Sequence, residues 1–383
     1  MSELYGSGAV AETGADSAAV AVDEGPAEPV EPAEPVEPVE PEDLVGPAGL
    51  SGDSGEPGEP EPLEPSAREE GAEGGFLGRV FDVTSWWSAP GERAVDRYAT
   101  VDRPDLPGAA PMAGVRYGTP LDGADGARAP LFDGPPSREQ TEQGWINDCG
   151  IIATLGGVAH HIPRAISECV RENDDGTYEV TLHQTKSSLY GDWSRFESTG
   201  AVTVLTVSPD LPVRSDSPHS LAYGKSGASD AAWLPILEKA VAGVDATWDE
   251  DRAKPVEGYM RLDLGSFPND RAELLTQLTG ESAYTDDFPT QYDMEGRSPD
   301  RQLLETFREK LAGGCPVLVG TMSADLNGRL LPKGLIHSHA YEVTAVDERG
   351  LIHLRNPHNM AHPEPLTVSE LRKSIKNRYT TIG

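Results

Sequence analysis

Four polar side chains that lie far apart in the chain are of the types needed for chemistry at a thiol. Cys149 follows Gln143 by six residues, and His339 and Asn356 come later, in that order. A thiolate is a strong nucleophile, an imidazole can take the proton of a thiol, and the carbonyl of an asparagine can fix the orientation of that imidazole. The amide of a glutamine can donate a hydrogen bond to a developing oxyanion. We therefore expect Cys149, His339, Asn356 and Gln143 to form one catalytic site.

The cysteine is expected at the start of a helix. Apolar residues recur with a helical period over residues 149–162, and Pro163 ends the pattern. Asn147 or Asp148 can act as the N-cap. Unpaired N–H groups and the helix dipole favour an anion at this end, so the position lowers the pKa of a thiol. The alternative is that Cys149 is only a small buried apolar residue, as many free cysteines are.

The histidine and the asparagine are expected on one face of a β-hairpin. Residues 339–346 and 351–356 have strand patterns on either side of a short polar loop. With a four-residue loop His339 lies opposite His358 and diagonal to Asn356, and with a two-residue loop it faces Asn356 directly. Either register brings the two Cβ atoms within about 5 to 8 Å of each other. A slip of one residue would turn the asparagine to the other face.

Two other histidines leave alternatives open. His337 shares a strand face with His339, so the two could be metal ligands, although no third ligand follows at a recognisable spacing. His358 could replace Asn356 as the group that orients His339.

The first 75 residues differ in composition from the rest of the chain. They hold 20 Asp or Glu residues, one Arg and 11 prolines, so they contribute −19 of the net charge of −33. Their centre repeats Glu-Pro at every third position over residues 28–41. Repeated proline and repelling carboxylates favour an extended chain without a core. We expect a disordered tail over 1–75, an irregular lead-in over 76–130 and a catalytic domain over 131–383.

Composition also limits the compartment and the partners. Three cysteines are too few for a disulfide framework and fit a reducing compartment, and we expect Cys169 and Cys315 to be packing residues. The start of the chain has no signal-peptide pattern, so a cytoplasmic location is expected, with non-Sec export or injection left open. No apolar stretch reaches the about 18 to 20 residues of a membrane span, and the acidic balance argues against nucleic acid. A protein or peptide remains as the expected substrate, and the oligomeric state is left open.

Helical and strand patterns both occur in the remaining catalytic domain. Helices come first and strands dominate later, which predicts an α+β fold in two lobes. The other expected helices span residues 163–170, 231–244, 270–278, 299–311 and 369–376, and the expected strands outside the hairpin span 176–182, 201–207 and 316–320.

These motifs resemble the protease core of the calpain family over about residues 131–383. The family's Gln-Gly-x-x-Gly-Asp-Cys-Trp, Gly-His-Ala-Tyr-Ser-Val-Thr and Arg-Asn-Pro-Trp segments are similar to Gln143-Gly144-x-x-x-Asp148-Cys149, Ser338-His339-Ala340-Tyr341-x-Val343-Thr344 and Arg355-Asn356-Pro357. The resemblance implies a papain-like fold, with Cys149 in a helical lobe and His339 and Asn356 in a β-rich lobe. It also implies a cysteine endopeptidase that works through an acyl-enzyme, with Gln143 in the oxyanion hole.

Several positions depart from the pattern of the family. Gly150 and His358 stand where the family has tryptophan, and Ser338 stands where it has glycine. In the family, the tryptophan at the position of His358 shields the hydrogen bond between the histidine and the asparagine from water. These departures leave open a catalytically weak or inactive binding module with a protease fold. A transglutaminase-like acyl transferase is a further alternative, although such sites usually have Asp as the third member.

The resemblance also makes calcium a possible cofactor. Calpains of animals bind calcium through acidic loops, and this chain has acidic clusters at residues 174–175, 249–251 and 286–287. None of the clusters has the spacing of an EF-hand. We expect them to be solvated loop charges, with no certain cofactor.

Overall fold

The computed structural model describes residues 94–108, 114–123, 127–247, 257–324 and 330–383, which belong to one unit of the chain. The predicted tail over 1–75 lies outside this part, as do residues 76–93 of the predicted lead-in.

The sequence suggested an irregular lead-in, but the described part of it contains regular strands. It contains β1 (Ala94–Val101) and β2 (Val115–Gly118). Strand β1 pairs in parallel with residues 201–207, and its last residue, Val101, is buried in the core. The partner lies about a hundred residues away in the chain, so no local pattern announces the pairing.

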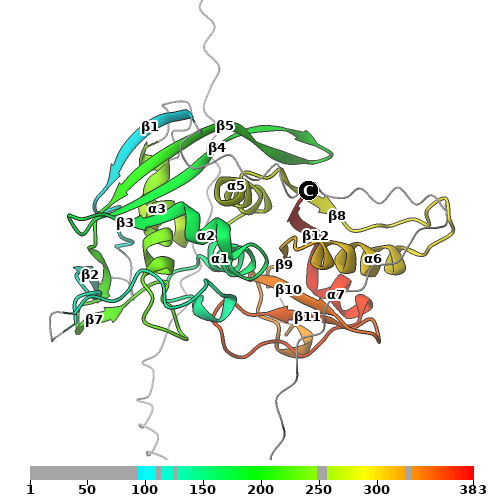
Figure 1. Ribbon diagram of the computed structural model, residues 1–383. Helices are drawn as coiled ribbons and strands as arrows, with labels where there is room; N and C mark the ends of the chain where they lie inside the picture. Colours follow the sequence, from blue (N-terminus) through cyan, green and yellow to red (C-terminus); the bar gives the residue numbers. More distant parts are fainter. Residues whose placement is uncertain (1–93, 109–113, 124–126, 248–256, 325–329) are drawn as a thin grey trace, which may run out of the picture. The chain divides into compact units, whose positions relative to one another are not determined.

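Nine strands of the described residues form one mixed sheet in the order β11-β10-β9-β12-β8-β5-β4-β3, with β1 also paired to β5 (Figure 1). Their bounds are β3 (Val170–Glu172), β4 (Tyr178–Tyr190), β5 (Trp193–Val207), β8 (Ala283–Asp287), β9 (Val317–Thr321), β10 (Ala340–Val346), β11 (Ile352–Arg355) and β12 (Ile375–Ile382). A smaller sheet joins β2 to β6 (Leu211–Arg214) and β7 (Ser217–Leu221). Every predicted strand is confirmed, whereas β3, β6, β7, β8 and β12 were not predicted.

All of the predicted helices are present. The helices of the described residues are α1 (Cys149–His161), α2 (Pro163–Cys169), α3 (Trp233–Thr247), α4 (Gly258–Asp263), α5 (Pro268–Thr279), α6 (Pro299–Ala312) and α7 (Val368–Ser374), with 3-10 turns η2 (Arg138–Gln140) and η4 (Pro332–Gly334). The cap signals explain several ends: Ser298 accepts a hydrogen bond from the N–H of Arg301 at the start of α6, and Gly280 takes a φ of 73° after α5. No described helix is both long and apolar enough to cross a membrane.

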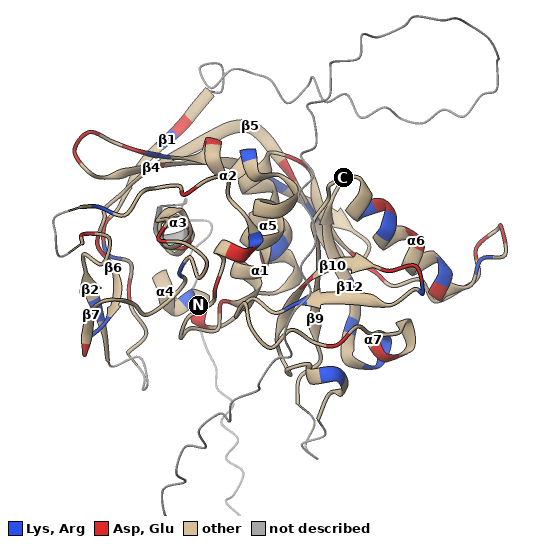
Figure 2. Ribbon diagram, turned by 60° about the horizontal axis from the view of Figure 1, so that its bottom comes forward, with Lys and Arg blue, Asp and Glu red and all other residues tan. Residues whose placement is uncertain are grey.

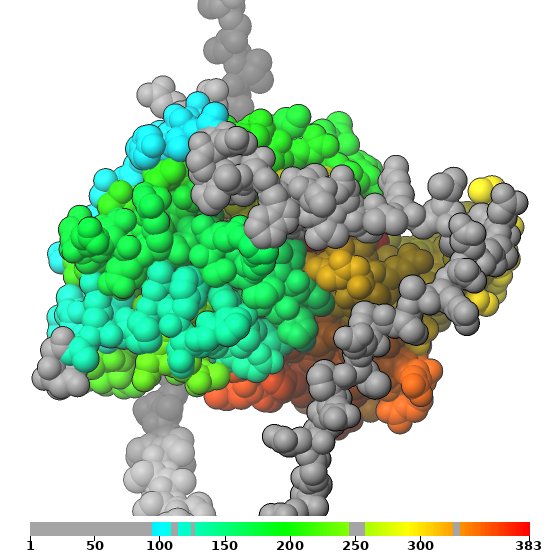
Figure 3. All heavy atoms as spheres, in the orientation of Figure 1, coloured from blue at the N-terminus to red at the C-terminus, as the bar shows by residue number. Residues whose placement is uncertain are grey.

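Buried apolar side chains form two clusters. The first surrounds α1, α3 and α5 and includes Cys149. The second lies among α6, α7 and β9 to β12 and includes Tyr341. Figure 3 shows residues coloured cyan to green and residues coloured gold to red on different sides of this unit. The fold is therefore a mixture of helix and sheet as predicted, but the long strands β4 and β5 accompany the helices of the first cluster.

Candidate active site

Helix α1 begins at Cys149, as the sequence predicts. Asp148 occupies the N-cap position, and its carbonyl oxygen accepts hydrogen bonds from the N–H groups of Ile151 and Ile152. Its side chain makes no cap hydrogen bond, contrary to the expectation for a capping Asp. Asn147, the other predicted cap, instead donates from Nδ2 to Asp263. No side-chain cap therefore accepts a hydrogen bond from the first N–H groups of α1.

The side chain of Asp148 is buried against Glu238 of α3. The two carboxyl groups interact electrostatically, and the N–H of Gly224 donates to Glu238 at 2.9 Å. Burial raises the pKa of Asp148 to about 7 and also raises the pKa of Glu238. An ionised Asp148 beside the start of α1 raises the pKa of the Cys149 thiol.

The thiol of Cys149 lies beside the strand that follows His339. Only 8% of Cys149 is exposed, and the N–H of Ala340 donates to its Sγ at 3.3 Å. Burial raises the pKa of this thiol, and the Ala340 N–H acts in the opposite direction. Burial alone therefore disfavours a thiolate, so ionisation needs a nearby positive charge.

The imidazole of His339 is bonded to Asn356. Its Nε2 lies 2.9 Å from the Asn356 Oδ1, which also accepts from the N–H of His358 at 3.1 Å. The Asn356 Nδ2 donates to the carbonyl of Ala361, so these contacts fix which end of the amide is the oxygen. Because Oδ1 can only accept, Nε2 carries a proton and Nδ1 keeps its lone pair. Burial lowers the pKa of His339, and the bond to Asn356 opposes that effect.

A bulge in the hairpin puts the two side chains on the same face. At the loop, Val346 pairs with Ile352, which is one residue away from the predicted register. The register then shifts at Thr344, so that Glu342 pairs with Arg355, as predicted for a four-residue loop. Without this shift the asparagine would point away from the histidine.

The other histidines near the site have different contacts. The ring of His358 stacks on that of His339, with centroids 5.4 Å apart and an interplanar angle of 7°. His358 thus covers His339, while Asn356 makes the orienting hydrogen bond. The Nδ1 of His337 lies 3.3 Å from the carbonyl oxygen of Met322. In the described part of the chain no three His, Cys, Asp or Glu side chains converge to hold a metal ion.

Gln143 joins the cysteine segment to the asparagine segment. Its N–H donates to the carbonyl of Pro357 at 2.9 Å, and its side-chain Nε2 donates to the carbonyl of Ile146 at 2.7 Å. The side chain is buried next to the turn that leads to Cys149. One amide hydrogen is therefore engaged, and the second is the one that could reach an oxyanion.

Behind the site lies a buried ionic cluster of Arg138, Glu342 and Arg355. Arg138 of η2 contacts Glu342 at 2.8 Å, and Arg355 is the cross-strand neighbour of Glu342. The guanidinium of Arg355 also donates to the carbonyl and hydroxyl oxygens of Thr141 and to Asn359. Burial raises the pKa of Glu342 to about 7, although Arg138 and Arg355 oppose the shift. The cluster ties the segment before Cys149 to the hairpin.

Sequence reasoning missed the residues of the ionic cluster and Glu238. A signal was present, because Glu238 lies within the apolar run of α3 and Glu342 within that of β10. A charged residue in such a run is buried only when it is paired.

Gly150 and Ser338 have structural explanations. A Cβ on Gly150 would overlap the Oγ of Ser266 and lie 2.9 Å from its Cβ, so the site has no room for the tryptophan of the family. Ser338 has a φ of 51°, which is the left-handed conformation that glycine adopts most readily. Ser338 therefore adopts a backbone conformation that suits the glycine found at this position in the family.

We expect Gly150→Ala to destabilise the protein by about 1 to 3 kcal/mol, because Ser266 must move. This outweighs the about 1 kcal/mol that alanine otherwise adds in a helix. Urea denaturation measures the change, and the added substitution Ser266→Gly should restore most of the stability. A Gly150→Ala variant as stable as the wild type would contradict this prediction and show that Ser266 can move at no cost.

Carboxylates of the described acidic clusters accept hydrogen bonds from nearby groups of the protein. Asp175 Oδ1 accepts from the N–H and hydroxyl of Thr177, and Asp287 Oδ1 accepts from the Trp193 side chain. Residues 249–251 lie outside the described residues. Asp175 of the first cluster thus stabilises its own turn, and Asp287 of the third cluster binds a side chain of the strand β5.

The chain matches the family model of the calpain family cysteine proteases over residues 125–362. It is 25% identical over 275 residues to a calpain of Schistosoma mansoni, which covers 67% of this chain and 32% of that protein. It is 26% identical over 236 residues to the calpain-type cysteine protease DEK1 of Zea mays, which covers 59% of this chain and 9% of that protein. The family match spans more than half of the chain, so the protein belongs to the calpain family of cysteine proteases, and its fold is papain-like.

Proposed function

We propose that this protein is a cysteine endopeptidase with Cys149 as nucleophile, His339 as general base and acid, and Asn356 as the residue that orients His339. The observation that supports this best is the bond between His339 Nε2 and Asn356 Oδ1 beside a thiol held at Ala340. The orientation leaves Nδ1 of His339 as the proton acceptor. We further propose that the two apolar clusters correspond to two lobes, one supplying Cys149 and the other the hairpin.

Each step of the reaction has a group to perform it. The Nδ1 of His339 takes the thiol proton, and the thiolate forms a C–S bond to the carbonyl carbon of a peptide. Gln143 Nε2 and the N–H of Cys149 would stabilise the oxyanion. The C–N bond then breaks, and the amine leaves with the proton from His339. Water, deprotonated by His339, attacks the thioester, the C–S bond breaks, and the thiol is restored with a free carboxylate product.

Replacing Cys149 with alanine should lower peptide cleavage by about a thousandfold or more, because no other group supplies the nucleophile. The test is mass spectrometry of the products from a peptide library, with Cys315→Ala as the matched control that should retain activity. Cleavage by Cys149→Ala at the wild-type rate would refute the proposal.

The products also separate the alternative functions. Hydrolysed peptides support an endopeptidase, whereas cross-links with release of ammonia would support a transglutaminase-like acyl transferase. If the wild type gives neither product and Cys149 reacts like an ordinary thiol, the inactive binding module is favoured.

A further inference from the structure

Arg271 of α5 is a buried cation that the proposed mechanism does not use. Only 5% of the residue is exposed, and its Nε has no hydrogen-bond partner within the described residues. Burying a guanidinium without a partner costs several kcal/mol in general. Such a group is retained only where the structure supplies a matching negative charge.

The surroundings place this side chain beside the nucleophile. A Cβ on Gly150 would lie 3.4 Å from the Cδ of Arg271, and a Cβ on Gly320 would lie 3.6 Å from its Nη1. Gly150 follows Cys149 directly. Gly320 pairs with Ala340, whose N–H donates to the thiol. Arg271 therefore lies with its stem next to the residue that follows Cys149 and its guanidinium next to the strand that pairs with Ala340.

The lack of a side chain at position 150 makes this arrangement possible. Where the family has a tryptophan, this chain has Gly150, and the space next to it is occupied by Ser266 and the stem of Arg271. A large side chain at 150 would displace both. The departure from the family thus coincides with a positive charge near the sulfur.

We propose that Arg271 is a positioning residue that, together with His339, holds Cys149 as a thiolate at neutral and mildly acidic pH. The inference rests on the proposed role of Cys149 as nucleophile. A thiolate at Cys149 adds a negative charge to that of Asp270 near the guanidinium, whereas a neutral thiol adds none. The fixed charge of Arg271 remains when His339 gives up its proton to the leaving group.

The charges around the two groups agree with this assignment. Burial lowers the pKa of Arg271 to about 10, so it is still a cation at pH 7, and Cys149 and Asp270 favour that charge while Arg378 opposes it. Burial raises the pKa of Cys149, which the Ala340 N–H and Arg271 lower and Asp148 raises. Tyr341, on the hairpin side, packs edge-on against the ring of His339, and burial and an ionised Cys149 both raise the pKa of Tyr341.

The pH dependence of Cys149 alkylation by iodoacetamide tests the proposal. The rate is followed by mass spectrometry from pH 4 to 10 in the full-length wild type, in Arg271→Met and in Arg271→Lys. In Arg271→Met the rise in reactivity should move to higher pH by about one unit or more, which is a tenfold loss of rate at any pH below both midpoints. Arg271→Lys should recover part of this shift. Arg128→Met, which removes a distant arginine, should leave the profile unchanged.

A second measurement separates this role from a structural one. Because methionine fills similar space and Cys149 can revert to a neutral thiol, the thermal midpoint of Arg271→Met should stay close to that of the wild type. Arg271→Gln should show the same shift in profile, and it serves if Arg271→Met does not fold. An unchanged alkylation profile in either folded variant would overturn the proposal. Alkylation needs no turnover, so this failure is distinct from absence of peptide cleavage.

Discussion

Replacing His339 with alanine is expected to lower kcat/KM for peptide hydrolysis by about a thousandfold or more. The substitution removes the group that takes the thiol proton and returns it to the leaving amine. It also removes one partner of the thiolate in a pocket where burial already raises the pKa of Cys149. Alkylation of Cys149 should therefore begin only near or above the about 8.5 of an ordinary thiol.

His337→Ala is the matched control for this prediction. His337 lies two residues away, and its ring faces the carbonyl of Met322 instead of Asn356. Its loss should change kcat/KM by less than tenfold. If His339→Ala retained activity within tenfold of the wild type, or if His337→Ala lost as much, the base would have to be another residue.

Replacing Arg355 with methionine is expected to destabilise the protein by about 3 to 5 kcal/mol. The guanidinium neutralises Glu342 and donates to Thr141, and all of these groups are buried. Methionine fills similar space but leaves buried acceptors unpaired, and removal of one member of a buried ionic cluster costs this much in general. Urea denaturation at pH 8 measures the loss.

The loss of stability in Arg355→Met should also depend on pH. Burial already raises the pKa of Glu342 to about 7, and Arg355 holds that pKa down. Without Arg355 the pKa rises further. A carboxyl group whose pKa is higher in the folded state loses its stabilising contribution as the pH rises through that pKa. The gap in stability between wild type and Arg355→Met should therefore widen from pH 5 to pH 8.

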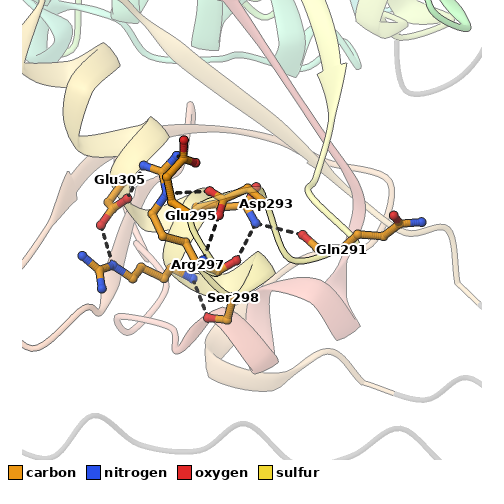
Figure 4. Close-up of polar contacts among 8 residues, drawn as sticks. Gln291, Asp293, Glu295, Arg297, Ser298 and Glu305 are labelled. Carbon is orange, nitrogen blue, oxygen red and sulfur yellow. Dashed lines mark hydrogen bonds and ion pairs between the residues drawn. The ribbon is translucent and has the colours of Figure 1, made fainter.

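Arg297→Met provides a control with a similar number of polar contacts. Arg297 contacts Asp293, Glu295 and Glu305 near the start of α6, in a network that is partly open to solvent (Figure 4). Figure 2 shows basic and acidic residues side by side along this helix. Exposed ion pairs typically contribute about 0 to 1 kcal/mol. An equal loss in Arg297→Met and Arg355→Met would contradict the role given to burial.

Local patterns were sufficient for much of the fold. The period of apolar residues and Pro163 defined α1, which begins at Cys149 and ends before Pro163, as the sequence predicts. Such signals act over a few residues, so the sequence shows them directly. Strands β1 and β12 were missed, because each is stabilised by partners far away in the chain.

The types of the four candidate site residues, the helix start at Cys149 and the hairpin with Asn356 could all be predicted from residue types and local patterns. The contacts that tune these residues could not, because they form only in the folded protein. The bulge at Thr344 sets the register, His358 stacks on His339, and Arg271 comes to lie next to Gly150 from a helix more than a hundred residues away. These features depend on packing between distant segments, and a charge such as that of Arg271 acquires its effect on Cys149 only when both are removed from water.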